Sequence, residues 1–285
     1  MYNEKLKLCV IVSTYCRKDG SSKNNLLKML KSLENQTYKN FKLFLIGDDY
    51  SDKEEFENIC KTYKGDIFYY NNQYSYRSYK FINKQNYWAI GGSKAIKLGL
   101  EKALNEGFNY YFHIDDDDTW LPLHIETVKL YLTMFPKSDF LFTRSHYCHK
   151  RVIPPDDYNK DLSKVGYNNY PPIPGYTCHS THVYNLNTLG SIIIKDLEYH
   201  ELMANNIHNQ VTKAYDTITK IVWDLKKTRT GTTNSALHET SVDFVLTPTD
   251  ARMAIRLCVD KDKYNSLYIP IITANKPSDG NIPEI

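Results

Sequence analysis

Short apolar runs of strand length alternate along the chain with segments whose apolar residues recur at helical spacing. A continuous apolar run bounded by polar residues is typical of a strand that a parallel sheet buries on both faces. The runs occupy residues 8–12, 41–46, 66–70, 110–114 and 140–143, and the helical patterns occupy residues 26–34, 52–63, 93–104 and 122–134. The alternation predicts an α/β fold, in which a mostly parallel sheet with right-handed crossovers is flanked by helices.

The pattern weakens after the fifth predicted strand, where proline clusters bracket an irregular stretch. We expect a short strand at residues 192–194 and a helix at 209–227 in this part of the chain. The region 270–285 is polar and contains three prolines, so we expect a tail that is disordered or lies on the surface. The chain therefore divides into a regular half, 1–145, an irregular half of the same domain, 146–269, and the tail.

Composition disfavours several classes of protein. The 285 residues carry a net charge of +3, and no run of Lys or Arg forms a basic stripe, so nucleic acid is not an expected partner. The six cysteines form no C-x-x-C pair and fit reduced thiols. No signal peptide and no stretch of membrane-spanning length is visible, so we expect a cytoplasmic protein without a transmembrane segment.

Polar clusters follow three of the predicted strands at the point where each strand ends. They comprise residues 14–17, 48–49 and 115–118. In an open α/β sheet the ligand lies beyond the carboxyl ends of the strands. Because the three clusters lie at such ends, the sequence predicts one ligand site at this edge of the sheet.

The third cluster consists of four consecutive aspartates, Asp115, Asp116, Asp117 and Asp118. Adjacent carboxylates repel one another, and a hard divalent cation such as Mg²⁺ or Mn²⁺, which prefers oxygen ligands, would neutralise them. The alternatives are a solvated acidic turn and a helix N-terminus capped by Asp118. The apolar strand that leads directly into the cluster favours the metal site.

The other two clusters offer groups suited to a nucleotide. Thr14, Tyr15 and Arg17 follow the first strand, where the tyrosine ring can stack on a base and the arginine can pair with phosphate. Asp48 and Asp49 follow the second strand and can accept hydrogen bonds from a ribose hydroxyl or a base N–H. The alternatives are a packed tyrosine with a solvated arginine, and a plain turn that starts the next helix.

A glycine pair begins the third predicted helix. Gly91 allows the backbone to approach a ligand closely, and the free N–H groups at a helix start favour an anion. Lys94 adds a positive charge one turn later. A plain helix start is the alternative interpretation.

Four segments, 10–17, 26–38, 46–52 and 113–122, together resemble the family-2 inverting glycosyltransferases of GT-A fold. They contain VIVSTYCR, SLENQTY, IGDDYSD and HIDDDDTWLP in that order and at the family's spacing. The resemblance covers roughly the N-terminal half of the chain. It implies that the regular half binds a nucleotide sugar and that the irregular half binds the acceptor and carries catalytic groups.

The resemblance also implies roles for individual residues. Thr14, Tyr15 and Arg17 would lie at the nucleotide, and Asp49, with Asp48 beside it, would bind the base or ribose. The aspartates would form the family's D-x-D motif. In that motif the direct metal ligand would be Asp117, and the residues that hold the ribose or metal-bound water would be Asp115 and Asp116.

The implied reaction moves a hexose or N-acetylhexosamine from a UDP-sugar to an acceptor hydroxyl on a glycan, a lipid-linked sugar or a protein side chain. Mn²⁺ or Mg²⁺ would stabilise the departing diphosphate, and a carboxylate would take the proton of the hydroxyl. The nearest match to the family's base is Asp216, in the segment KAYDTITKI, with Asp224, Glu239 and Asp243 as alternatives.

One departure from the family concerns the helix after the third strand. Where the family often carries Ala-Arg-Asn, this chain has Ala-Ile-Lys at 95–97. The role of the missing arginine would then fall to Lys94 or Lys97.

Three other interpretations stay open from the sequence. A protein of this fold could bind a nucleotide sugar or a carbohydrate without turnover, and a nucleotidyltransferase also uses paired aspartates on an α/β sheet. The loop after the first strand carries a single glycine, Gly20, which disfavours the nucleotidyltransferase. A zinc site is a third possibility, although its candidate ligands match no standard spacing: His146, Cys148, His149, Cys178, His179 and His182.

Overall fold

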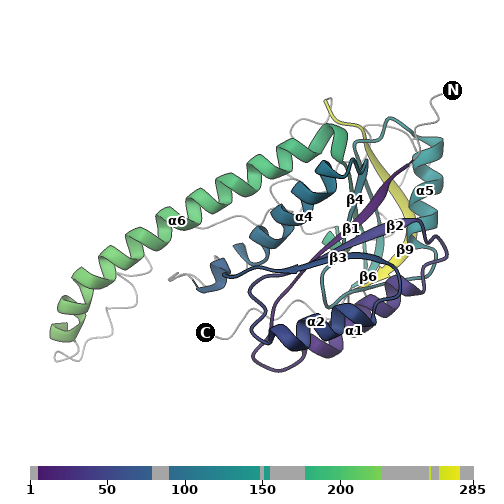
Figure 1. Cartoon of the computed structure of the whole chain (residues 1–285). Helices are drawn as coiled ribbons and strands as arrows, with labels where there is room; N and C mark the ends of the chain where they lie inside the picture. The colour runs from purple at the N-terminus through teal and green to yellow at the C-terminus, as the bar shows by residue number, and fades with distance from the viewer. Residues whose placement is uncertain are drawn as a thin grey trace.

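The computed structural model describes residues 6–78, 90–147, 151–154, 177–225, 257 and 263–276, and for residues 147, 151, 207 and 210–225 it describes the backbone alone. Within these residues, nine strands form one sheet in the order β3-β2-β1-β4-β8-β6-β9-β5, with β7 paired to β6 (Figure 1). The strands are β1 (Leu8–Thr14), β2 (Phe41–Gly47), β3 (Asp66–Asn71), β4 (Tyr110–His113), β5 (Thr119–Trp120), β6 (Phe140–Tyr147), β7 (Arg151–Ile153), β8 (His182–Asn185) and β9 (Ser266–Asn275).

Helices cover both faces of the sheet, which confirms the predicted α/β class. They are α1 (Ser22–Glu34), α2 (Lys53–Thr62), α4 (Ser93–Asn105), α5 (His124–Met134) and α6 (Leu186–Leu225). Side chains of α1, α2 and α5 pack with Val10 and Val12 of β1 in one core, whereas α4 and α6 pack with Cys9 and Ile11 in the other. Successive side chains of a strand point to opposite faces, so the apolar run 8–12 of β1 serves both cores.

The sheet is uniformly parallel only in its first part. Strands β3, β2, β1 and β4 run parallel, but β8 pairs antiparallel with both β4 and β6. Strand β9 runs parallel to β6 and antiparallel to β5. The sheet is therefore mixed, since strands from the C-terminal half join it in both directions.

Residues 192–194 are not a strand, contrary to the prediction from their β-branched run. They lie within α6, whose buried residues Leu189, Ile193 and Leu197 recur every four positions and pack with Leu100 and Ala103 of α4. Contact with α4 thus overrides the local preference of isoleucine for strands. The helix predicted over 209–227 is the distal part of α6, which extends away from the sheet in Figure 1.

The C-terminal region is also more ordered than its composition suggested. Residues 270–275, predicted to belong to a tail, lie in β9, and Thr273 and Ala274 are buried. Pro122, predicted as an early residue of α5, precedes the helix, whose N-cap is Leu123. Strand pairing with β6 explains the first difference, since it orders a segment whose local sequence is ambiguous.

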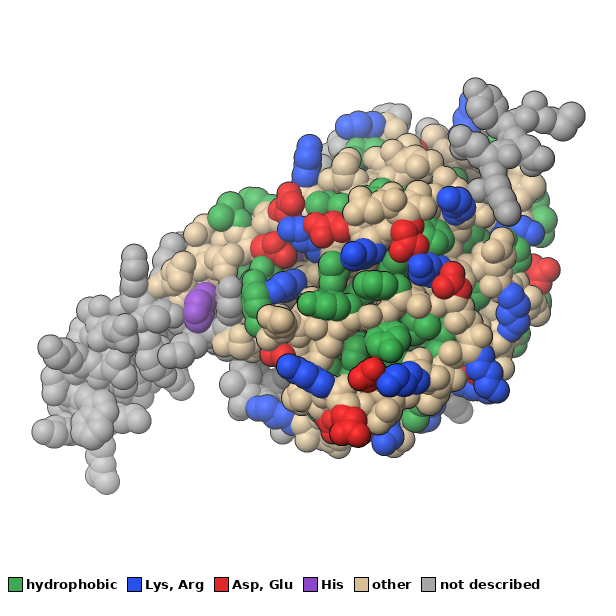
Figure 2. Space-filling model, in the orientation of Figure 1, with side chains coloured by type: hydrophobic (Ala, Val, Ile, Leu, Met, Phe, Trp, Pro, Cys, Tyr) green, Lys and Arg blue, Asp and Glu red, His purple; other side chains and the backbone are tan. Residues whose placement is uncertain are grey.

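The face of the molecule seen in Figure 2 mixes positive and negative side chains with small apolar areas between them. It presents no field of a single sign, as the small net charge predicts. Within the described part of the chain, none of the helices combines the length and the hydrophobicity that a bilayer span requires.

Candidate active site

The ends of β1, β2 and β4 meet at one edge of the sheet, as predicted. The backbone N–H of Asp48 donates to the carbonyl of Thr14 (2.7 Å), which ties the turn after β2 to the end of β1. The hydroxyl of Thr14 donates to a carboxylate oxygen of Asp116 (2.6 Å), which ties β1 to the turn after β4. The parallel pairing of these strands therefore gathers the three polar clusters.

The four aspartates form a tight turn, closed by a hydrogen bond from the N–H of Asp118 to the carbonyl of Asp115 (3.2 Å). The turn leads into β5, so Asp118 does not cap a helix and that alternative is wrong. Asp116 and Asp118 are buried, whereas Asp115 and Asp117 are partly exposed. The chain thus presents two of its four carboxylates to the edge of the sheet.

Arg17 neutralises one side of the turn. Its guanidinium donates to both oxygens of Asp116 (2.5 and 3.1 Å) and reaches Asp117 at 3.3 Å. Burial, and then the neighbouring charges of Asp115 and Asp116, raise the pKa of Asp117. An added cation would stabilise the charged form of a carboxylate in this position, because it offsets the repulsion from the neighbouring carboxylates.

Lys276 neutralises the other side of the turn. Its ammonium lies 3.1 Å from Asp115 and 3.2 Å from Asp118, and the lysine side chain is only 13% exposed. Ser180 completes this side, since its hydroxyl accepts from the N–H of Asp115 (3.0 Å) and donates to Asp118. Burial alone would lower the pKa of Lys276, but the carboxylates of Asp115 and Asp118 raise it above its ordinary value.

The donor set of the turn fits a hard divalent cation. One carboxylate oxygen each from Asp115, Asp117 and Asp118 lie within 4.8 Å of one another. Oxygen ligands of this kind suit Mg²⁺ and Mn²⁺. Burial would raise the pKa of Asp115, but Lys276 and then His113 hold it well below its ordinary value, so this carboxylate stays charged.

Two histidines flank Asp115. His113 Nε2 lies 3.0 Å from Asp115 Oδ1, and His179 Nδ1 lies 3.9 Å from the same oxygen. The two rings are stacked, with centroids 3.5 Å apart and an angle of 17° between the planes. Because ring nitrogens donate their lone pairs in the plane of the ring, stacked rings cannot both aim at one ion, and the pair serves better to hold Asp115 in place.

Of the two aspartates after β2, Asp48 is buried and accepts three hydrogen bonds from the protein through one of its oxygens. Its Oδ2 accepts from Ser75 Oγ (2.6 Å), from Arg77 Nε (3.3 Å) and from the backbone N–H of Gly92 (3.1 Å). Asp49 is exposed and has a positive φ of 56°. The turn therefore directs Asp49 outward, and of the pair only Asp49 presents its side chain to solvent.

Arg77 joins this group to the first cluster. Its guanidinium carbon lies 3.6 Å from the centroid of the Tyr15 ring, and that of Arg17 lies 4.8 Å from the same centroid. A side chain at Gly91 would place its Cβ 2.5 Å from Arg77 Nη2, so the glycine makes room for the guanidinium. Lys94 lies one turn further on, with Nζ 2.9 Å from the centroid of the Tyr74 ring.

The predicted catalytic base, Asp216, lies in a part of the chain whose side chains the structure does not describe. Asp216 and its alternative Asp224 belong to the distal part of α6, where the structure describes the backbone alone, and Glu239 and Asp243 lie outside the described residues. Of the candidate zinc ligands, Cys148 and His149 also lie outside them. Cys178 and His182 are buried, and His182 bonds to Tyr184 and Thr177.

Sequence reasoning missed Lys276, Arg77, His113 and Ser180. Lys276 lay in a region expected to be a tail, and Arg77 lay in a tyrosine-rich loop. His113 carried a usable signal, because it ends the strand that leads into the aspartates. Each of the others reaches the site through contacts that are distant in sequence.

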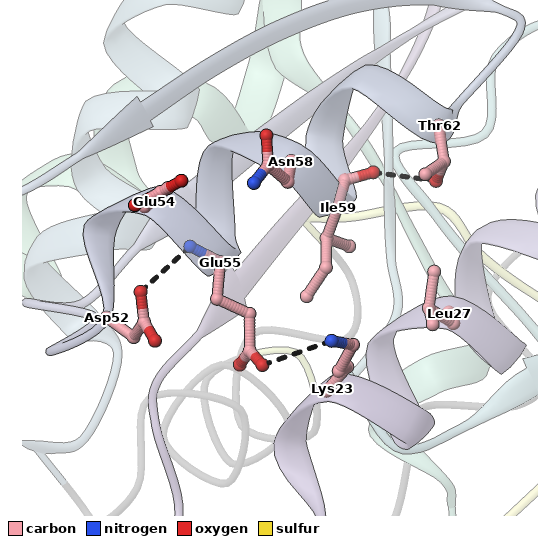
Figure 3. Close-up of a pocket in the computed structure, with 8 residues that line it drawn as sticks. All are labelled: Lys23, Leu27, Asp52, Glu54, Glu55, Asn58, Ile59 and Thr62. Carbon is pink, nitrogen blue, oxygen red and sulfur yellow. Dashed lines mark hydrogen bonds and ion pairs between the residues drawn. The ribbon is translucent and has the colours of Figure 1, made fainter.

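A separate open groove lies between α1 and α2. In Figure 3, Lys23 and Glu55 face each other across it (3.4 Å) and Asp52 accepts from the N–H of Glu55 (2.8 Å). Its lining residues are Lys23, Leu27, Asp52, Glu54, Glu55, Asn58, Ile59 and Thr62. The strand-end clusters do not line it, and Asp52 there acts as the N-cap of α2.

Comparison with known proteins places this arrangement among sugar-transferring enzymes. The sequence model of Glycosyl transferase family 2 matches residues 9–186. An uncharacterized glycosyltransferase, R139 of Acanthamoeba polyphaga mimivirus, is 30% identical over 178 residues, which are 62% of this chain and 72% of that protein. The family match covers the three strand-end clusters.

Solved structures share the fold at low sequence identity. Residues 1–349 of TarS from S. aureus, in complex with UDP, superpose with a TM-score of 0.55 at 14% identity, covering 96% of this chain and 61% of that one. The mannosyltransferase PcManGT from Pyrobaculum calidifontis, in complex with GDP-Man and Mn²⁺, gives 0.52 at 14%, covering 96% and 58%. The chain thus spans about 60% of the length of these structures, and the likeness confirms the GT-A fold.

Proposed function

The chain belongs to glycosyl transferase family 2, and from that premise we propose that it is a metal-dependent, inverting enzyme that uses a UDP-sugar. Membership of the family sets aside the nucleotidyltransferase. The sugar we propose is a hexose or N-acetylhexosamine, and the acceptor is a hydroxyl group of a glycan, a lipid-linked sugar or a protein.

The observation that carries the proposal is the pairing of a partly exposed acidic turn with a fixed arginine. Asp117 has an oxygen within 4.8 Å of oxygens of Asp115 and Asp118, and Arg17 lies beside it. A nucleoside diphosphate has a negative diphosphate that such a site can hold only together with a cation. TarS with UDP, and PcManGT with GDP-Man and Mn²⁺, support a donor of this chemistry.

The proposed roles follow from which groups are free to act. Asp117 would hold Mn²⁺ or Mg²⁺, with Asp115 and Asp118 completing the oxygen set. When bound, the ion would neutralise the charge that develops on the departing diphosphate. Asp49, which is exposed, would accept hydrogen bonds from the base or ribose, while Asp48 holds Arg77 and Gly92 in position.

The remaining nucleotide contacts would come from the end of β1 and the start of α4. Tyr15, with Arg77 over its ring, would offer its ring edge to the base. Arg17 would hold Asp116 and approach the diphosphate. Gly91 and Lys94, at the start of α4, would lie on the same side of the nucleotide.

In the proposed reaction, the oxygen of the acceptor hydroxyl attacks the anomeric carbon as the bond from that carbon to the diphosphate oxygen breaks. The electron pair of the broken bond leaves with the diphosphate, and the hydroxyl proton passes to a carboxylate. Attack from the face opposite the leaving group inverts the anomeric centre. Asp216 stays our prediction for that carboxylate, with the acceptor bound by the half of the domain after residue 145.

The first experiment is a calorimetric and thermal-shift titration of the purified protein with UDP, GDP and CDP and with their sugars. Each titration is run with and without Mn²⁺, because a ligand that binds the folded state raises its apparent stability. We expect uridine nucleotides to stabilise the protein in the presence of the ion, and Asp117→Ala to abolish that stabilisation. Asp66→Asn, which alters an exposed carboxylate on β3, is the matched control.

Two results would contradict the proposal. One is the absence of any nucleotide binding with or without the ion. The other is equal binding by the wild type and Asp117→Ala, since the aspartate would then not hold the ion. If the protein prefers GDP to UDP, the proposed transferase activity stands and the proposed donor becomes a GDP-sugar.

A further inference from the structure

Lys276 reaches the acidic turn through strand pairing rather than through a flexible tail. Thr119 and Asn275 are the last pair of the antiparallel β5–β9 ladder, and Asp118 and Lys276 are the next residues on either side. The backbone N–H of Lys276 donates to the carbonyl of His146 (2.8 Å), which extends the pairing of β9 with β6. The lysine is thus held opposite Asp118 by ladders on both sides of β9.

The ammonium lies on two of the carboxylates that a metal would use. Lys276 Nζ lies 3.1 Å from Asp115 Oδ2 and 3.2 Å from Asp118 Oδ2. Asp115 and Asp118 are two of the three residues whose oxygens lie within 4.8 Å of one another. An ammonium and a divalent ion are both positive and both satisfied by carboxylate oxygens, so they compete for these groups.

The formal charges of the turn also indicate that Lys276 and a divalent ion compete. The turn carries four carboxylates, and its two fixed cations, Arg17 and Lys276, leave a formal charge of −2 when all six groups are ionised. A single divalent ion would cancel that charge. Without the lysine the formal charge of the turn would be −3, and its attraction for a divalent ion would be stronger.

We infer that Lys276 is a built-in cation of the acidic turn that weakens the binding of divalent ions and keeps the turn folded when no ion is bound. The inference rests on the proposed metal site. It assigns the end of β9 the function of setting how much Mn²⁺ the site requires. The lysine is a positioning residue, because it acts through Asp115 and Asp118.

The test measures the affinity for Mn²⁺ alone, by calorimetry and by the paramagnetic resonance signal of free Mn²⁺, with no nucleotide present. Lys276→Met keeps the aliphatic length and removes the charge, and we expect it to bind Mn²⁺ about tenfold more tightly or better. Lys276→Arg should bind within about threefold of the wild type. Lys263→Met, which alters an exposed lysine just before β9, should leave the affinity unchanged.

A second measurement keeps the test decisive if Lys276→Met folds poorly without an ion. Its melting temperature should then rise more on addition of Mn²⁺ than that of the wild type, because the ion replaces the missing charge. In the Asp118→Asn background, substitution of Lys276 should give a smaller gain in Mn²⁺ affinity, since one shared carboxylate is gone.

The outcomes separate this inference from the proposed function. If the wild type binds Mn²⁺ and Lys276→Met binds it equally or more weakly, the inference is wrong and the metal site stands. If neither protein binds Mn²⁺ and neither is stabilised by it, the metal site and the inference both fail. Tighter binding by Lys276→Met, with Lys276→Arg unchanged, supports both.

Discussion

The guanidinium of Arg77 lies over the ring of Tyr15, with its carbon 3.6 Å from the ring centroid. Arg77 also donates to Asp48, and Tyr15 lies beside Arg17, which pairs with Asp116. These contacts form one continuous row from the end of β2, across the end of β1, to the turn after β4. Substitutions of neighbouring residues in this row should therefore differ in how they affect stability and nucleotide binding.

Asp48 and Asp49 are adjacent, yet we expect their substitutions to change the free energy of unfolding by very different amounts. Asp48→Ala should lower the free energy of unfolding by about 2–3 kcal/mol, because it leaves buried donors of Ser75 and Gly92 without their acceptor. Asp49→Asn should change it by less than about 0.5 kcal/mol, since the side chain is exposed and Asn tolerates positive φ. Urea denaturation measures both, and equal losses would contradict the assignment of Asp48 as the structural member of the pair.

The hydroxyl of Thr14 joins β1 to the acidic turn. Thr14→Val removes the hydroxyl with little change of shape, and we expect a loss of about 1.5–3 kcal/mol because the lost hydrogen bond is to a buried carboxylate. Chemical denaturation is the measurement. Thr37→Val is the control, because the hydroxyl of Thr37 bonds to Glu126 at an exposed position and its loss should cost far less.

Stability should fall on the acid side of neutrality because two buried histidines are held uncharged. Burial lowers the pKa of His124 to about 3 and, with the nearby His179 and His113, holds that of His182 well below its ordinary value. Below pH of about 6.5 the unfolded chain takes up protons that the folded chain does not, so the free energy of unfolding decreases by up to about 1.4 kcal/mol per pH unit for each histidine.

Denaturation curves recorded between pH 5 and 8 measure this dependence. His124→Gln should remove one histidine's share of the slope below pH of about 6.5 and leave the curve above it parallel to that of the wild type. An unchanged acid slope in the variant would show that His124 is not held neutral in the folded state.

Alanine substitutions of Gly92 and Gly20 distinguish the stability cost of backbone strain from that of steric crowding. Both have positive φ, 76° and 73°, but an added Cβ at Gly92 would lie 2.4 Å from Ser13 Oγ, whereas none of the described atoms lies within 4 Å at Gly20. Gly20→Ala should therefore cost about 1 kcal/mol from strain alone. Gly92→Ala should cost clearly more, since it also moves the N–H that Asp48 accepts. Thermal unfolding compares the two, and equal shifts would contradict the close approach.

Much of the fold could be predicted from the sequence because its signals are local. The apolar runs of β1, β2 and β4 need burial on both faces, and the helical spacing of residues such as Leu26, Leu30 and Leu33 specifies which side of α1 is buried. Parallel strands align their carboxyl ends, so the convergence of Thr14, Asp48 and the aspartates also follows from the sequence.

Other features depended on contacts between residues far apart in the chain. The run 192–194 is helical because α4 packs against it, and β9 is a strand because β6 and β5 pair with it. Local preference is weak compared with the burial and hydrogen bonding that such contacts supply.

The sequence by itself determined that the four aspartates follow a buried strand, and that the loop carrying Arg17 follows a neighbouring strand. Only the tertiary structure decided how the charges of the acidic turn are distributed: Asp116 to Arg17, Asp115 and Asp118 to Lys276, which is about 160 residues away. It also decided that Asp48 points inward and Asp49 outward. The physical reason is that charges interact through space, with a strength set by distance and burial rather than by separation along the chain.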